Sequence, residues 1–214
     1  MAHRDEGVPP ALWGLVGVMA AIEFALWLSD SGVLGQDLRM TALIYGAFWP
    51  QLLEGTLIGA YPGQTAAMFV THAFLHGGFL HLAMNAVVLL ALGKAVTEQA
   101  GTVALMLVFL ISAIGGGAGF ALLSDGEAPM IGASGAVFGF IGLWQYGEAR
   151  LRLARRMSLR PVLGTCLGLI LANVVIAVML QGALAWEAHL GGFLAGAALG
   201  PLVTRLVQAR QRPV

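Results

Sequence analysis

The sequence predicts an all-α membrane protein, a bundle of six transmembrane helices with a long, partly helical first outer loop. Hydrophobic residues make up 58% of the 214 residues and charged residues only 10%. The mean hydropathy is +0.84, and the charges gather in clusters that leave six apolar runs between them. Such a chain has too little polar surface to cover a soluble domain. We therefore expect a single membrane domain over residues 1–214, with a short cytoplasmic N-terminus (1–10) and a short cytoplasmic tail (205–214).

The six apolar runs are the predicted spans. A hydrocarbon core of about 30 Å needs roughly 20 residues, and most runs approach this length. The second and fourth runs are short, so we expect flanking residues, including the stem of Lys94, to complete them. The first run carries Glu23, with no cationic partner nearby in sequence, and is longer than a secretory signal core, which favours a retained span. The runs cover residues 11–28, 79–93, 102–123, 131–146, 162–180 and 183–203.

The connection between the first two spans, residues 30–78, is far longer than the others. Its apolar residues recur in short bursts broken by Pro and Gly, as in Phe48-Trp49-Pro50. This pattern predicts short helices at the membrane interface. Long structured loops are uncommon without a function.

The basic residues predict the orientation. When the loops are assigned alternately to two sides, Arg39 alone falls on one side and all other Lys and Arg on the other. The positive-inside rule makes the second side cytoplasmic and places both termini there, and we expect a bacterial inner membrane. The cytoplasmic set is Arg4, Lys94, Arg150, Arg152, Arg155, Arg156, Arg160, Arg205, Arg210 and Arg212.

Polar side chains begin three of the spans on the outer side. Ser134 lies in the first turn of the fourth span and His189 in the first or second turn of the sixth. In the second span, the Gly-Gly pair at 77–78 interrupts any preceding helix, which places His81 in the first turn and Asn85 one turn deeper on the same face. At about 1.5 Å per residue, all four lie within roughly 15 Å of the outer surface.

Glycines predict that the fourth and sixth spans pack closely. Small residues at steps of four let helix backbones approach each other in lipid. A serine is inert at neutral pH unless a neighbouring group takes its proton, and histidine suits that task best. The predicted close pair therefore bears a nucleophile and a base. The glycines are Gly135 and Gly139 on the fourth span and Gly192, Gly196 and Gly200 on the sixth.

The chain resembles the rhomboid intramembrane serine proteases. The resemblance rests on Gly132-Ala133-Ser134-Gly135 in the fourth span, the run HLAMN from His81 to Asn85 in the second, and the run AHLGGFLAG that contains His189 in the sixth. The order of these motifs, the six-span layout and the long first loop also match.

The resemblance implies a role for each matched residue. Ser134 becomes the nucleophile and His189 the general base, in a dyad without a carboxylate. His81, Asn85 and the backbone N–H of Ser134 become the oxyanion donors. The remaining matched residues have supporting roles: Gly132, Gly135, Phe138 and His76.

Two stretches depart from the family pattern. Many members carry Trp-Arg in the first outer loop, where residues 66–72 here read AAMFVTH, so we expect that loop to be braced differently. One turn after Ser134, where many members carry a tyrosine against the catalytic histidine, this chain has Phe138. Its ring can still pack on His189, and only the hydroxyl is missing.

The resemblance implies that the partners are single-pass transmembrane proteins, cut near the outer end of their helix, together with membrane lipid. It implies no cofactor and no metal, and the balanced formal charge gives no nucleic-acid signal. The oligomeric state is not predicted. Cys166, the single cysteine, is interpreted as a small apolar filler.

Two alternatives stay open. His72, His76 and His81 are spaced by four and five, so a metal or haem protein ligated by histidines is one. Against it, the Gly-Gly pair at 77–78 breaks the helix, and His72 and His76 are interpreted as bracing the loop. The second is a non-catalytic relative that binds transmembrane clients. A channel or transporter is disfavoured because no inverted repeat is evident.

Overall fold

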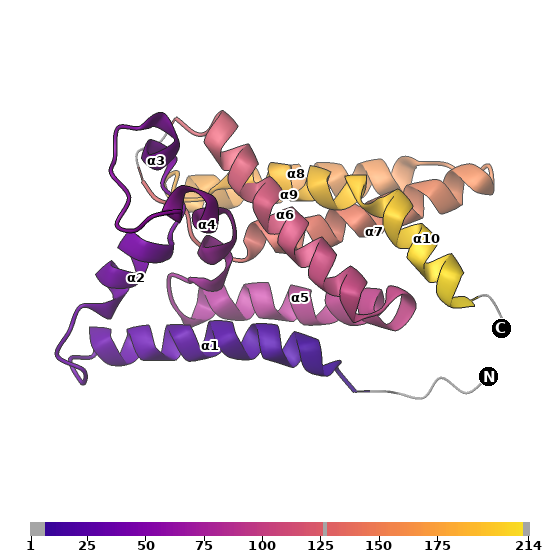
Figure 1. Cartoon of the computed structure of the whole chain (residues 1–214). Coiled ribbons are helices and arrows are strands. Elements are labelled where there is room, and N and C mark those ends of the chain that lie inside the picture. Colours follow the sequence, from indigo (N-terminus) through magenta and orange to yellow (C-terminus); the bar gives the residue numbers. More distant parts are fainter. Residues whose placement is uncertain (1–6, 126–127, 212–214) are drawn as a thin grey trace.

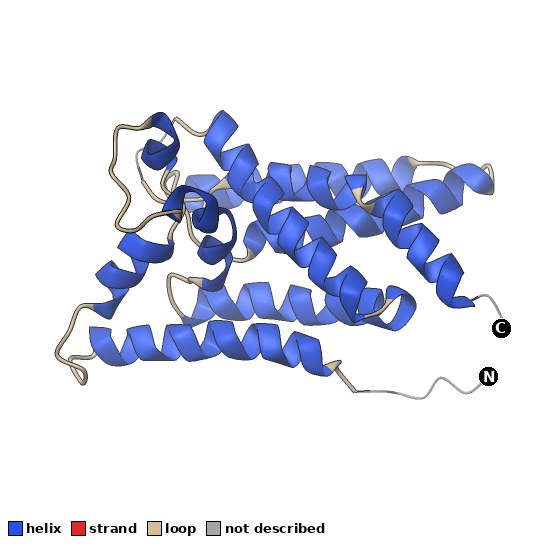
Figure 2. Cartoon of the chain, viewed as in Figure 1, coloured by secondary structure: helices blue, strands red, loops and turns tan. Residues whose placement is uncertain are grey.

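The computed structural model describes residues 7–125 and 128–211, and it is helical almost throughout, with no strand in those ranges (Figures 1 and 2). The predicted all-α class is confirmed. Arg4 and Arg212, used above for orientation, lie outside the described residues. The helices are α1 (Pro10–Asp30), α2 (Leu38–Gly46), α3 (Pro50–Glu54), α4 (Gln64–Thr71), the 3₁₀ turn η1 (His72–Phe74), α5 (Phe79–Ala100), α6 (Thr102–Leu123), α7 (Ser134–Ala154), α8 (Arg160–Met179), α9 (Trp186–Ala198) and α10 (Gly200–Gln211).

Within the described residues, four helices are long and apolar enough to cross a membrane: α1, α5, α6 and α8. The pair α9 and α10 would make a fifth span if it counts as one helix bent by 42°. Helix α7 has 21 residues, but its last third is polar, with Glu148, Arg150 and Arg152. The count of six spans therefore stays a prediction.

The sixth predicted span differs from the structure. A single helix over 183–203 was expected, whereas α9 begins at Trp186, stops at Ala198 and resumes at Gly200 in a new direction. Pro201 explains the break, because it has no backbone N–H for the carbonyl of Ala197 and its ring crowds the preceding turn. The predicted tail from residue 205 continues α10 as far as Gln211.

Helix α6 lies at the centre of the bundle and contacts α5, α7 and α9. Its side chains Leu105, Val108 and Phe109 are fully buried in the main apolar core. In contrast, α8 has no buried residue. The described chain begins and ends at one end of the bundle, and α2–α4 lie at the other (Figure 1).

The predicted close pair of helices is confirmed as α7 and α9. A methyl group on Gly192 would overlap the backbone carbonyl of Gly135, and one on Gly196 would overlap that of Gly139. The third glycine of the predicted stripe, Gly200, is the first residue of α10 and faces the ring of Tyr146. The missing side chains allow backbone-to-backbone contact where the two helices begin.

The long outer loop forms the predicted short helices α2, α3 and α4. Phe48 anchors it: the side chain is fully buried, its ring packs edge-on against Phe69 and Phe120, and its backbone pairs with Met130 just before α7. This bridge ties the loop to the segment that carries Ser134.

Glu23 has a cationic partner that its sequence neighbourhood did not reveal. Arg39 of α2 donates to the Glu23 carboxylate at 2.9 Å, to Asp30 at 2.7 Å and to the backbone carbonyl of His76 at 3.0 Å. Burial alone would lower the pKa of Arg39, but its bonds to Glu23 and Asp30 offset this and raise it above the ordinary value. Arg39 therefore braces the first loop against α1, in a chain that lacks the Trp-Arg pair.

Replacing Arg39 by Ala is expected to destabilise the protein by about 3 kcal/mol, because the Glu23 carboxylate, 2% exposed, loses its counter-charge. Thermal unfolding in detergent measures this. The double variant Arg39→Ala, Glu23→Gln should recover part of the loss, since no charge is left buried. Glu98→Ala, which breaks an exposed pair with Lys94, should change stability by less than about 1 kcal/mol. An Arg39→Ala protein as stable as the wild type would refute the bracing role.

Candidate active site

The structure places the predicted nucleophile at the start of a helix. Ser134 is the first residue of α7, so its backbone N–H has no partner within the helix. Gly132, two residues earlier, has φ +118°, which favours glycine. A Cβ on Gly132 would lie 2.8 Å from two ring atoms of His81. This glycine therefore lets the His81 ring approach the turn that leads into Ser134.

His81 presents a hydrogen-bond donor at that turn. Its Nδ1 accepts from the backbone N–H of Gly77 at 3.3 Å, so the ring proton is on Nε2. Nε2 is one of the two ring atoms nearest to Gly132. Asn85 lies one turn deeper on α5, is buried, and donates one amide N–H to the His81 carbonyl at 3.1 Å. As predicted, α5 begins at Phe79, directly after the Gly-Gly pair.

The predicted base lies in the first turn of α9. His189 is 8% exposed, and its ring stacks on Phe138 with a centroid distance of 4.1 Å and an interplanar angle of 6°. The predicted packing of Phe138 is confirmed. Because Phe138 follows Ser134 by one turn of α7, the stack places the imidazole over the helical face that bears the serine. Within the described residues, Ser134 Oγ makes no hydrogen bond to His189.

Gly135 lies where three helices, α6, α7 and α9, approach one another closely. A Cβ at this position would lie 3.2 Å from the Cα of Gly116 on α6 and 3.3 Å from the carbonyl of Ala188 on α9. Both contacts are tighter than side chains normally make. The absence of a side chain next to Ser134 thus brings the backbone just before His189 close to the nucleophile.

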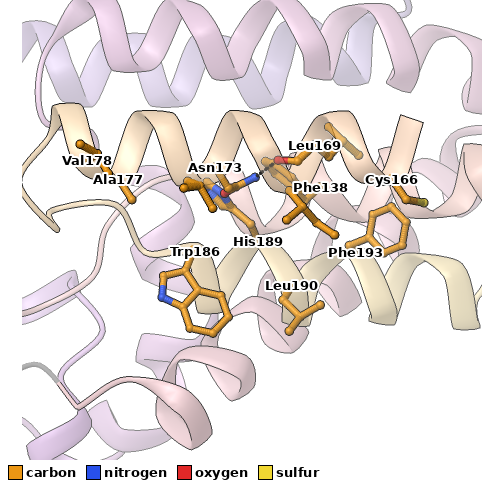
Figure 3. A pocket seen from close by; sticks show the side chains of 12 residues that line it. Phe138, Cys166, Leu169, Asn173, Ala177, Val178, Trp186, His189, Leu190 and Phe193 are labelled. Carbon is orange, nitrogen blue, oxygen red and sulfur yellow. Dashed lines mark hydrogen bonds between the residues drawn. The ribbon is translucent and has the colours of Figure 1, made fainter. Parts of the chain in front are cut away.

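An apolar cavity of about 600 Å³ opens beside His189, between α8 and the pair α7 and α9 (Figure 3). Phe138, Cys166, Trp186 and Phe193 are among the residues that line it. Its polar lining groups are His189 and Asn173. The cavity can therefore receive an apolar side chain or segment next to the imidazole.

Sequence reasoning missed Asn173 of α8. Its Oδ1 lies 2.5 Å from Nδ1 of His189, and its amide donates to the carbonyl of Leu169 at 2.8 Å. The available signal was an amide in an otherwise apolar span, a residue type that commonly bonds between membrane helices.

Within the described residues, the other two histidines lie in the loop behind the site. His72 is fully buried, with Nε2 3.3 Å from the Ala113 carbonyl, and the His76 ring meets that of His81 at 5.1 Å. Burial lowers the pKa of each to about 4, and for His76 the neighbouring His81 adds to the effect. Both rings are therefore neutral at pH 7. In the described part of the chain, no group of three His, Cys, Asp or Glu side chains is arranged to hold a metal ion.

Comparisons with known proteins agree with these features. A family model described as the Rhomboid domain matches residues 63–206. RHOMBOID-like protein 5 of Arabidopsis thaliana is 34% identical over 128 residues, which are 59% of this chain and 40% of that protein. Rhomboid protease GluP of Bacillus subtilis (strain 168) is 32% identical over 142 residues, 61% of this chain and 25% of that protein. Putative rhomboid protease YdcA of the same organism is 25% identical over 201 residues, 94% of this chain and 92% of that protein. The chain spans half or less of the length of the first curated relatives that it matches.

Proposed function

The chain belongs to the rhomboid family of integral membrane proteins, and from this premise we propose that it is an intramembrane serine endopeptidase with Ser134 as nucleophile and His189 as general base. One observation carries the proposal. The His189 ring is stacked on Phe138, one turn of α7 from Ser134, so a base lies over the face that bears the only nucleophile candidate at this helix start. Buried aromatic packing fixes the plane of the imidazole, and general base catalysis requires a positioned base.

In the proposed mechanism, Ser134 Oγ attacks the scissile carbonyl carbon while His189 accepts the hydroxyl proton. The tetrahedral intermediate collapses as His189 returns that proton to the leaving amine, and an acyl-enzyme on Ser134 results. A water molecule, deprotonated by His189, then hydrolyses the ester and restores both residues.

Three donors are positioned for the oxyanion of the intermediate. The N–H of Ser134 is free at the start of α7, Nε2–H of His81 lies at the turn before it, and the Asn85 amide uses one of its two N–H groups within α5. Donors fixed in place before the charge develops contribute most where water is scarce, about 3 kcal/mol for one good donor.

The proposed substrate is the transmembrane helix of a single-pass protein, cut near its outer end. A peptide bond inside a helix is shielded, so cleavage needs local unwinding, which small residues near the cut favour. The site lies at the end of the bundle that holds the α2–α4 loop, and the Arg150–Arg160 cluster spans the last turns of α7 and the connection to α8, at the other end of α7. We accordingly place the site on the outer side, both termini in the cytoplasm and the protein in a bacterial inner membrane.

A non-catalytic binder of transmembrane clients is the second candidate. The observation that favours it is the missing hydrogen bond between Ser134 Oγ and His189 in the described structure. Catalytic hydrogen bonds often form only when substrate is bound, so this observation does not outweigh the stacked base and the donors.

Covalent labelling tests the proposal. A fluorophosphonate phosphonylates a serine whose hydroxyl is activated by a base, and it leaves ordinary serines unmodified. We expect it to modify Ser134 in the detergent-solubilised protein, as read by mass spectrometry of the intact chain and its peptides, and to stop cleavage of a fluorescent transmembrane-helix reporter in proportion. The Ser134→Ala protein is the control and should remain unmodified. A wild-type protein that neither reacts nor cleaves would refute the protease and leave the client binder.

A further inference from the structure

We propose that Asn173 of α8 is a positioning residue that holds His189 in the tautomer and ring orientation of a general base. The effect of Asn173 on catalysis rests on the proposed function, whereas its effect on the tautomer of His189 does not. Its structural half stands on the 2.5 Å contact between Asn173 Oδ1 and His189 Nδ1, seen at the edge of the cavity in Figure 3.

The direction of this hydrogen bond follows from the second bond of the amide. The Asn173 NH₂ group donates to the carbonyl of Leu169 at 2.8 Å, one turn back on α8. If the amide were turned round, its oxygen would face the Leu169 carbonyl and two acceptors would be opposed. The oxygen therefore faces His189, and since it can only accept, Nδ1 of the imidazole carries the proton.

A proton on Nδ1 leaves the lone pair on Nε2, at the opposite edge of the ring. A general base must present a lone pair to the hydroxyl it deprotonates. In the other tautomer Nε2 would carry a hydrogen and could not accept the serine proton. Asn173 thus favours the neutral form in which His189 is able to act.

Asn173 and Phe138 restrain the ring in complementary ways. The stack on Phe138, within 6° of parallel, fixes the plane of the imidazole. The stack alone permits a half-turn of the ring about the Cβ–Cγ bond. This rotation returns the ring to the same plane but puts the carbon Cδ2 where Nδ1 was. The bond to Asn173 opposes that rotation, because a C–H group would leave the amide oxygen unpaired in an apolar lining.

Within the described residues, Asn173 is the one hydrogen-bond partner of His189 Nδ1. His81 of α5 is the titratable side chain that faces His189, and it belongs to the proposed oxyanion donors. Cys166 of α8 lines the same cavity, but within the described residues it makes no hydrogen bond to the His189 ring. The tautomer of His189 therefore depends on a residue from α8, a helix with no buried residue.

Kinetics of two substitutions test the catalytic half. Asn173→Leu, similar in size but without an acceptor, should lower kcat for cleavage of the reporter helix by about 10- to 100-fold while KM changes less than about twofold. Asn173→Asp keeps an acceptor, so it should retain activity within about tenfold. Its carboxylate also favours the protonated imidazole, so the acidic limb of the pH–activity profile should move to higher pH. Val175→Ala, a neighbouring change on the exposed face of α8 and outside the cavity lining, should alter neither kcat nor the profile.

Histidine ¹⁵N NMR tests the structural half without any enzyme activity. The chemical shifts of the two ring nitrogens report which one carries the proton, and the protein has five histidines, so His189 is assigned by comparison with His189→Gln. We expect the Nδ1–H form in the wild type and a mixture in Asn173→Leu. An Nε2–H wild type would overturn the proposal.

The outcomes separate this inference from the proposed function. Wild-type activity in a folded Asn173→Leu protein, together with inactive Ser134→Ala, would overturn the positioning role and leave the protease in place. A wild type that cleaves no substrate would refute the protease, and the NMR result would still decide whether Asn173 sets the tautomer. Equal loss in Asn173→Leu and Val175→Ala would mark a structural effect on α8 and overturn the positioning role.

Discussion

Replacing Ser134 by Ala is expected to reduce kcat for a transmembrane-helix substrate by at least about 10⁴-fold. Alanine has no nucleophile, and the remaining donors can only polarise the peptide bond. Since Ser134 is partly exposed at the start of α7 and makes no side-chain hydrogen bond in the described structure, its removal should leave thermal unfolding unchanged. Kinetics with a fluorescent reporter in detergent, beside a melting curve, measure both. Cleavage within tenfold of the wild type would show that Ser134 is not the nucleophile.

His189→Ala should cause a similar loss, and the double variant should be no worse than either single one. A serine without its base and a base without its serine are equally unproductive, so their effects on kcat do not add. His189→Ala also removes the stack on Phe138 and the bond to Asn173, so its stability must be compared separately. Additive losses would indicate that the two residues act independently, and would contradict the dyad.

The start of each polar span was predictable because the signals are local. The Gly-Gly pair at 77–78 separates the preceding element from α5, which begins at the next residue. The spacing of glycines on α7 and on α9 identifies the closely packed face of each helix from that helix's own sequence. Phe138 was predictable for the same reason, since it lies one turn from Ser134 on the same helix.

The contacts that sequence reasoning missed join segments whose relative placement is decided by packing. Arg39 reaches Glu23 only because α2 folds back beside the end of α1. No sequence pattern around either residue identifies the other as its partner. Asn173 reaches His189 because α8 passes beside α9, and an amide in an apolar span does not specify its partner. The break before α10 had a local signal, Pro201, which the prediction of one continuous apolar span overlooked.

Replacing Gly192 by Ala is expected to destabilise the protein by about 3 kcal/mol and to lower kcat by about 100-fold. The added methyl group would overlap the backbone carbonyl of Gly135, which is held by its own helix and cannot move aside as a flexible side chain would. Helices α7 and α9 must therefore separate, and overpacking of this kind typically costs 1–3 kcal/mol or more. Because Gly135 adjoins Ser134 and Gly192 follows His189 by one turn, the same separation moves nucleophile and base apart, and a displacement of about 1 Å can reduce rates about 100-fold.

Gly147→Ala is the matched control, because it adds the same methyl group to α7 at a position with nothing within 4 Å. Alanine favours a helix over glycine by about 1 kcal/mol, so this variant should be as stable as the wild type or slightly more so, with full activity. Alanine brings the same gain in helix propensity at position 192. The cost of the clash must therefore exceed this gain for the predicted loss of stability to appear. Melting curves and reporter kinetics on both variants measure the difference. If Gly192→Ala behaves like Gly147→Ala, the helices have room for a side chain, and close backbone packing is not what sets the distance between Ser134 and His189.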